Sequence, residues 1–211
     1  MTPFVKEFPD DPGGAEREWR TLTFLAEHAP GLAPEPIEFD GERVVMTRLQ
    51  GVPLRSLRVT PEHVTAMAAA VETLHACPAA GVPRRSGEPL EMVAWLRERC
   101  TDPAVLAWLE SPGLEHLLDA EPDPVIGTGD GNLANFLWDG ERIRLIDFEH
   151  AGRCDRAYDL AEIAEHVSLS FPSSWFLSHF SYSAERVLEF RRLLAAYWSV
   201  RTGRPFSAER P

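Results

Sequence analysis

The sequence lacks any run of apolar residues that approaches the roughly 20 needed for a membrane helix. Its N-terminus has no basic stretch leading into an apolar core, so we expect neither a signal peptide nor a membrane partner. Cysteine is scarce, and no pair among Cys77, Cys100 and Cys154 has the spacing of a metal site. This scarcity favours three reduced thiols in a cytoplasmic protein.

Basic residues are also few, 21 against 33 acidic ones, and the formal net charge is −12. Proteins that bind the phosphates of nucleic acids need a basic face, so the balance argues against a nucleic-acid partner. An acidic protein suits a cationic substrate, but acidity also keeps a protein soluble, and both interpretations stay open.

Hydrophobic periodicity and turn signals divide the chain into a short β-rich part and a longer helical part. For the first part we predict a strand, a helix and a hairpin, at residues 4–8, 15–28 and 36–47. For the second we predict a hairpin at 136–146 and helices at 60–77, 88–100, from 102, 155–168 and 183–200. The sequence pattern changes from mostly β-prone to mostly helical at Gly51-Val52-Pro53. We therefore predict an α+β fold with a small lobe at residues 1–50, a larger helical lobe at 51–211, and a cleft between them.

One segment carries side chains suited to chemistry. Asp130 and Asn135 lie in a turn-prone loop before the second hairpin, and Asp147 follows its last strand. Phosphoryl transfer from a magnesium nucleotide needs a carboxylate near the acceptor hydroxyl, and an amide oxygen and a second carboxylate on the metal. Mg²⁺ suits this set because it takes few protein oxygens beside phosphate oxygens and waters. The alternative is that Asp130 and Asn135 only shape a turn through hydrogen bonds to the backbone.

These motifs resemble those of the aminoglycoside phosphotransferase / choline kinase family, which has a protein-kinase-like, two-lobed fold. The resemblance is carried by residues 129–140, 145–149 and 155–161, and it extends to Val5-Lys6, to Glu18 and to residues 44–54. It implies an α+β, kinase-like fold with a truncated small β lobe, and an enzyme that uses ATP and Mg²⁺.

The resemblance also implies roles for individual residues. Asp130 would be the catalytic base, and Asn135 and Asp147 would hold Mg²⁺. The nucleotide site would consist of Lys6 on the α and β phosphates, Glu18 paired with that lysine, and the backbone from Thr47 to Leu49 against the adenine. Asp159 would support the catalytic loop and take no part in the chemistry.

Two of these positions have alternatives. A lysine near an N-terminus is usually a solvated side chain, so Lys6 depends on the resemblance for its role. Glu16 is a rival to Glu18 on the same predicted helix, although the apolar phase of Trp19 and Leu22 favours Glu18.

The chain departs from the family pattern in two places. Thr128 stands where a loop-holding histidine is common, and we expect its hydroxyl to make one of the same hydrogen bonds. Only five residues precede Lys6, without a glycine-rich turn to cover the phosphates. We therefore expect weak ATP binding or an element supplied by a partner chain, and an exposed sheet edge that invites a homodimer.

We predict a phosphotransferase acting on a hydroxyl of a small molecule, of an aminoglycoside-like or amino-alcohol kind. The rivals are a degenerate kinase-like binding or regulatory module, and a metal-dependent phosphohydrolase. Asp155, Glu162 and Glu165 are candidates for an acidic pocket that would take a cationic acceptor, although a solvated helix face is an equal interpretation. The seven histidines have no ligand spacing, so we expect surface or core positions, with His150 alone facing the cleft.

Overall fold

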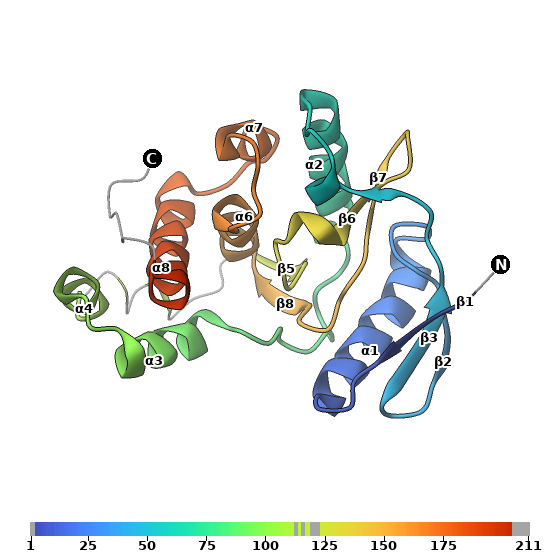
Figure 1. Ribbon diagram of the computed structural model, residues 1–211, viewed down its shortest axis with the longest axis horizontal. Coiled ribbons are helices and arrows are strands. Elements are labelled where there is room, and N and C mark those ends of the chain that lie inside the picture. The colour runs from blue at the N-terminus through green and yellow to red at the C-terminus, as the bar shows by residue number, and fades with distance from the viewer. Residues whose placement is uncertain (1–2, 112–113, 115–116, 119–122, 204–211) are drawn as a thin grey trace.

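The computed structural model describes residues 3–111, 114, 117–118 and 123–203 (Figure 1). Its N-terminal part is an antiparallel three-stranded sheet with one helix packed on it. The strand order is β1 (Pro3–Glu7), β3 (Arg43–Thr47), β2 (Pro36–Phe39), and helix α1 (Pro12–His28) contacts β2 and β3. The strand, the helix and the hairpin predicted for this part are all present.

Helix α1 begins earlier than the predicted Ala15. The Asp11 carboxylate caps it by accepting a hydrogen bond from the Gly14 amide at 2.8 Å, and Pro12 occupies the first turn. A capping aspartate before a proline is a strong start signal, and it outweighs the helix-weakening effect of the glycines that follow. The buried face of the helix carries Leu22 and Leu25, and Glu18 lies on the same buried side.

The rest of the described chain is mostly helical and surrounds two small sheets. Its helices are α2 (Pro61–His75), α3 (Pro89–Arg99), α4 (Pro103–Leu109), α6 (Arg156–Glu165), α7 (Ser173–Leu177) and α8 (Ala184–Thr202). One sheet has the order β4 (Val52–Pro53), β6 (Phe136–Trp138), β7 (Ile143–Leu145), and the other pairs β5 (Pro124–Gly127) with β8 (Gly152–Asp155). Helices α6 and α8 pack together and lie beside this second sheet (Figure 1).

Most of the predicted elements of this part are confirmed, but α6 ends early, and β4, β8 and α7 were not predicted. Helix α6 ends at Glu165 instead of near residue 168, and its C-cap His166 has extended backbone. Strand β8 was missed because its four residues include one apolar side chain, Cys154, and no β-branched or aromatic residue to signal a strand. The lobe boundary at residues 50 and 51 stays a prediction.

The three cysteines are free and buried, as the sequence indicated. Within the described ranges, the structure contains no helix long and apolar enough to cross a membrane.

Candidate active site

Asp130 lies in the loop between β5 and β6, where several groups hold its carboxylate. Oδ1 accepts a hydrogen bond from the Asn132 amide at 3.1 Å, and Oδ2 accepts one from Asn135 Nδ2 at 3.3 Å. His166 Nε2 lies 3.3 Å from Oδ1. Burial on its own would raise the pKa of Asp130, but the contacts with His166, Asn132 and Asn135 outweigh it and lower the pKa. The carboxylate is therefore ionised at neutral pH.

His166 is oriented by hydrogen bonds on its other ring nitrogen. The Ser168 amide lies 3.1 Å from His166 Nδ1, and the Ser168 hydroxyl lies 2.8 Å from it while accepting a bond from the Leu133 amide. Because Nδ1 accepts, the neutral ring carries its proton on Nε2, and this N–H donates a hydrogen bond to Asp130. From the sequence we expected His166 to be a surface or core residue, and this contact was not predicted. No local motif marks it, since it enters from the end of α6.

Two glycines let the catalytic loop approach neighbouring backbone. At Gly129, with φ of +83°, a Cβ atom would lie 2.4 Å from the Ala151 nitrogen. At Gly131 a Cβ atom would lie 2.7 Å from Ile163 Cα in α6. Only glycine fits at either position. The close packing fixes the position of Asp130 relative to helix α6.

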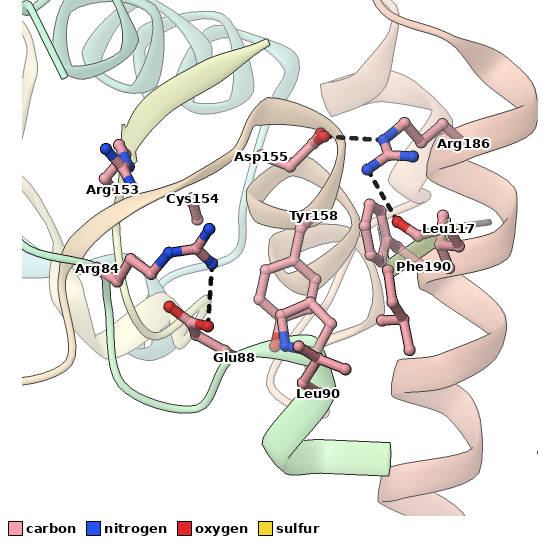
Figure 2. Close-up of a pocket in the computed structure, with 12 residues that line it drawn as sticks. Arg84, Glu88, Leu90, Leu117, Arg153, Cys154, Asp155, Tyr158, Arg186 and Phe190 are labelled. Atoms are coloured by element: carbon pink, nitrogen blue, oxygen red, sulfur yellow. Dashed lines mark hydrogen bonds and ion pairs between the residues drawn. The ribbon is translucent and has the colours of Figure 1, made fainter. Parts of the chain in front are cut away.

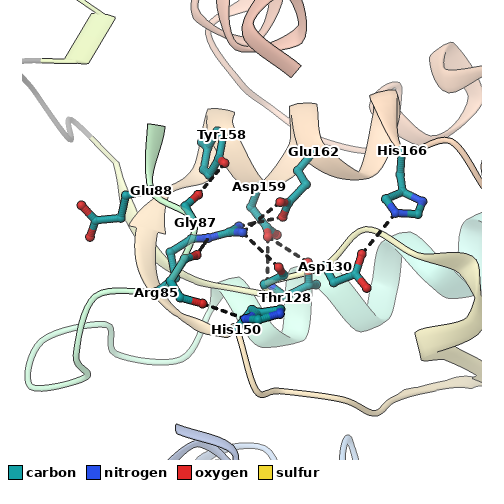
Figure 3. Close-up of polar contacts among 12 residues, drawn as sticks. Arg85, Gly87, Glu88, Thr128, Asp130, His150, Tyr158, Asp159, Glu162 and His166 are labelled. Atoms are coloured by element: carbon teal, nitrogen blue, oxygen red, sulfur yellow. Dashed lines mark hydrogen bonds and ion pairs between the residues drawn. The ribbon is translucent and has the colours of Figure 1, made fainter. Parts of the chain in front are cut away.

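Asp159 of helix α6 supports the start of the loop at Thr128, as the family resemblance implied (Figure 3). Its fully buried carboxylate accepts hydrogen bonds from the Thr128 amide at 2.7 Å and hydroxyl at 2.9 Å. The second oxygen lies 2.8 Å from His75 Nε2. Burial on its own would raise the pKa of Asp159, but these bonds, above all that of His75, lower it. Thr128 thus makes the loop-holding bond expected of its hydroxyl.

A buried ion pair that the sequence analysis missed braces the other side of the loop. Arg85 donates to both oxygens of Glu162, at 2.7 and 2.8 Å, and to the Gly129 carbonyl at 3.0 Å (Figure 3). Both side chains are almost fully buried, so each charge depends on the other.

Asp147 leaves β7 in an unusual backbone conformation. Its φ is +70°, the only positive value for a non-glycine among the described residues. Such a conformation costs energy and persists only where the surrounding structure holds it, and residues of this kind are common at functional sites. The amide of the preceding residue, Ile146, donates a hydrogen bond to the Asn135 carbonyl at 3.1 Å. This bond connects the loop that carries Asp147 to the loop that carries Asp130 and Asn135.

Asn135 and Asp147 suit a Mg²⁺ ion bound together with phosphate. The amide nitrogen of Asn135 donates to Asp130, which leaves its oxygen as the available ligand. In the described ranges no three His, Cys, Asp or Glu side chains form a metal cluster. A single carboxylate and an amide oxygen are the sparse protein set that Mg²⁺ accepts when phosphates complete its shell.

Lys6 of β1 reaches the same loop. Its ammonium contacts Asp147, and it lies 3.0 Å from both Glu18 Oε2 and Glu149 Oε2. Burial on its own would lower the pKa of Lys6, but the Glu18 and Asp147 carboxylates outweigh it and raise the pKa. Glu18 is 1% exposed and also accepts a bond from the Phe148 amide at 2.8 Å.

Two cavities flank these residues. The first, of about 320 Å³, is lined by five of the predicted site residues: Lys6, Glu18, Thr47, Leu49 and Asp147. Its apolar wall includes Phe4, Met46, Leu137 and Ile146. The second, of about 670 Å³, has Asp130, Arg85, Glu162 and His166 in its wall. His150 lines it too, as predicted, but the expectation that it would be the only such histidine is wrong, because His166 lines the same cavity.

The prediction that Asp155, Glu162 and Glu165 together form an acidic acceptor pocket is wrong. Only Glu162 lines the larger cavity, and Arg85 pairs with it. Glu165 lies 2.6 Å from Arg191, and Asp155 lies 2.8 Å from Arg186 beside a separate cavity of about 40 Å³ (Figure 2). These carboxylates are neither solvated nor free for a ligand.

The element order and the loops around Asp130 and Asp147 define a kinase-like fold. The chain belongs to the phosphotransferase enzyme family, whose model matches residues 4–199. No curated protein matches the chain.

Solved structures share the fold. Aminoglycoside phosphotransferase APH(3'')-Id from Streptomyces rimosus, in complex with ADP and streptomycin, is 20% identical with a TM-score of 0.70, over 93% of this chain and 86% of that one. Choline kinase LicA from Streptococcus pneumoniae is 22% identical with a TM-score of 0.69, over 95% and 76%. The aminoglycoside-3'-phosphotransferase of type VIII is 25% identical with a TM-score of 0.63, over 92% and 84%. The predicted family and α+β, kinase-like fold are confirmed.

Proposed function

We propose that this chain transfers the γ-phosphoryl group of ATP, with Mg²⁺, to a hydroxyl group of a small molecule. The observation that carries the proposal is the placement of Asp130 in the wall of one cavity and of Lys6 and Asp147 in the wall of the other. Asn135 joins the two through its bond to Asp130 and its backbone bond to Ile146. Related folds in complex with ADP, or with ATP and streptomycin, support nucleotide use.

The smaller cavity is the nucleotide site in this proposal. Its apolar wall takes the adenine, with the backbone of Thr47 to Leu49 at the ring edge. Lys6 binds the α and β phosphates and is held by Glu18. Asn135 and Asp147 hold Mg²⁺, which when bound neutralises charge on the phosphate oxygens.

Asp130 acts on the acceptor. Its ionised carboxylate accepts a hydrogen bond from the incoming hydroxyl and orients the oxygen toward the γ-phosphorus. It takes the proton as the new oxygen–phosphorus bond forms and the bond from the γ-phosphorus to the bridging oxygen breaks, with ADP as the leaving group. His166 and Asn135 fix the carboxylate for this role, so little reorganisation is needed when the acceptor binds.

The names of the related structures suggest the first acceptors to test. They include complexes of streptomycin and gentamicin, and a choline kinase. An aminoglycoside or an amino alcohol is therefore the starting panel for the acceptor hydroxyl.

The test measures ATP consumption with Mg²⁺ across such a panel, for the wild type and for Asp130→Asn. We expect the variant to lose about 10²- to 10⁴-fold in kcat, while its Kd for Mg-ATP is unchanged. Asp10→Asn, on an exposed turn, is the matched control. Equal turnover by wild type and Asp130→Asn would remove Asp130 from the mechanism.

The rival binding module differs in one measurable property. It predicts a Kd for Mg-ATP above about 1 mM, or no binding, in calorimetry, whereas the enzyme binds it with a Kd below about 1 mM, the upper end of typical KM values. The intact hydrogen bonds from Thr128 to Asp159 favour the enzyme, because they supply the loop support that a degenerate loop would lose. A phosphohydrolase would release phosphate without any acceptor.

The homodimer is proposed through strand β1. In the described part of the chain β1 pairs with β3 on one side only, and Phe4 and Val5 are 40% and 45% exposed. Edge strands with exposed apolar side chains favour pairing with another strand. Sedimentation of the wild type and of Val5→Lys tests it: the variant should be more monomeric, and an unchanged sedimentation coefficient contradicts the proposal.

A further inference from the structure

The cavity beside Asp130 has a charge balance opposite to that of the whole chain. The chain carries a net charge of −12. The charged residues that line this cavity in the described ranges are three arginines and two acids: Arg55, Arg85, Arg201, Asp130 and Glu162. A local excess of positive charge in so acidic a protein points to a ligand of the opposite sign.

The excess remains when the internal ion pair is set aside. Arg85 and Glu162 neutralise each other through two short hydrogen bonds, and both are buried. Asp130 serves the reacting hydroxyl in the proposed function. Arg55 and Arg201 are then the charges that a bound acceptor would meet.

These two guanidinium groups have no carboxylate partner among the described residues. Arg55 lies in the short helix η1 (Leu54–Ser56), which packs on the catalytic-loop helix η2 (Leu133–Asn135). Arg201 lies in the last turn of α8, where it donates to the Tyr197 hydroxyl and sits 5.7 Å from the centre of that ring. Both are exposed. A guanidinium group presents paired donors that match a carboxylate or a phosphate.

Aromatic side chains of α8 lie between Arg201 and Asp130 in the series of contacts along this cavity. The Trp198 ring meets His166 edge-on at 5.3 Å, and His166 contacts Asp130. Arg201 follows Trp198 by three residues, which is about 4.5 Å along a helix axis. In order along the wall, Asp130 contacts His166, His166 contacts Trp198, Trp198 contacts Tyr197, and Tyr197 contacts Arg201, so an acceptor hydroxyl at Asp130 and a charged group at Arg201 are separated by the aromatic rings.

We propose that this cavity selects alcohols that carry an anionic group, a carboxylate or a phosphate, and that Arg201 binds this group while a planar body of the acceptor lies against Trp198. The proposal rests on the proposed function for the phosphoryl transfer itself. A polycationic acceptor would place several positive charges near Arg55 and Arg201, with Asp130 as its single unpaired carboxylate in the described wall.

The experiment uses three probes that share one benzyl alcohol and carry an anionic, a neutral or a cationic para group: para-(hydroxymethyl)benzoate, para-(hydroxymethyl)benzamide and para-(hydroxymethyl)benzylamine. Calorimetry measures their binding to the full chain without nucleotide, for the wild type, Arg201→Gln and Arg201→Lys. Arg20→Gln on α1 is the matched control, because it removes an exposed positive charge away from the cavity. Phosphoryl transfer to each probe is then measured with Mg-ATP.

We expect the benzoate to bind at least tenfold more tightly than the benzylamine. Arg201→Gln should lose about tenfold or more for the benzoate and nothing for the benzamide, which is the loss of one charge-assisted contact. Arg201→Lys should keep most of the preference, and Arg20→Gln all of it.

The proposal is overturned if the benzylamine binds as well as the benzoate, if Arg201→Gln leaves the ratio unchanged, or if no probe binds. A higher kcat/KM for streptomycin than for the benzoate overturns it while the proposed function stands. If the benzoate binds in an Arg201-dependent way but receives no phosphoryl group, the proposed function fails while the proposed selection for an anionic group stands.

Discussion

His166 Nε2 lies 3.3 Å from Asp130 Oδ1, so a side chain from the end of α6 touches the carboxylate proposed as the base. The ring has little freedom to leave this position. Ser168 bonds its other nitrogen, and Trp198 packs against its face. A histidine held this firmly acts as a positioning residue, because it fixes where the Asp130 oxygen meets the acceptor.

We predict that His166→Phe lowers kcat by about 10- to 100-fold, the cost of a misplaced catalytic group. Phenylalanine keeps a ring against Trp198 but cannot donate to Asp130. Because His166 lies outside the nucleotide cavity, the Kd for Mg-ATP should stay at the wild-type value. His28→Phe, at an exposed position on α1, is the control. Steady-state kinetics and calorimetry check both points, and a wild-type kcat in His166→Phe would refute the positioning role.

The sequence predicted the parts of the site that are local. Asp130, Asn135 and Asp147 stand on one hairpin and its flanking loops, so their spacing along the chain determines how they meet in space. Glu18 was chosen over Glu16 from the helical phase of the apolar residues. The structure agrees, since Glu18 is 1% exposed and Glu16 has an exposed side chain.

The parts that depend on tertiary packing were not predictable. Arg85 enters from the segment between α2 and α3, and His166 and Arg201 lie at helix ends, where no periodic signal distinguishes a site residue from a solvated one. The acidic residues on and beside α6 gave a wrong prediction for the same reason. Their charges were visible in the sequence, but their arginine partners come from α8 and from the segment after α2.

Asp159 should make the stability of the protein depend on pH. Its pKa in the folded chain lies below its value of about 3.9 in an unfolded chain. The stabilisation is therefore fully present above about pH 3.9, and it is lost as the pH falls through the folded pKa. We expect Asp159→Asn to lower the free energy of unfolding at pH 7 by about 1.5–3 kcal/mol, the value of a hydrogen bond to a charged group.

Urea unfolding from pH 7 to pH 3 measures this effect. The difference between wild type and Asp159→Asn should shrink below about pH 3.9, where the unfolded wild-type chain is protonated. Asp123→Asn is the control, because the Asp123 side chain is 58% exposed and its ion pair with Arg156 is worth about 1 kcal/mol or less. A difference that stays constant over the whole pH range would contradict the charged role of Asp159.

Glu18 links the lysine of β1 to the metal loop. One of its oxygens lies 3.0 Å from Lys6 Nζ and accepts the Phe148 amide at 2.8 Å, next to Asp147. We predict that Glu18→Gln raises the Kd for Mg-ADP by about tenfold or more, because the neutral amide no longer holds the ammonium by a charge-assisted bond. Without that bond Lys6 keeps Asp147 and Glu149 as partners, and it is drawn further toward the metal ligand.

Glu16→Gln supplies the matched control for this experiment, since it makes the same chemical change on the exposed face of the same helix. Burial raises the pKa of Glu18, so removing its charge relieves a desolvation cost, and the free energy of unfolding should change little. A fall in nucleotide affinity with unchanged stability therefore separates a binding role from a structural one. If Glu18→Gln and Glu16→Gln bind Mg-ADP equally well, Lys6 does not depend on Glu18 for nucleotide binding. The role proposed for Glu18 in the nucleotide site is then wrong.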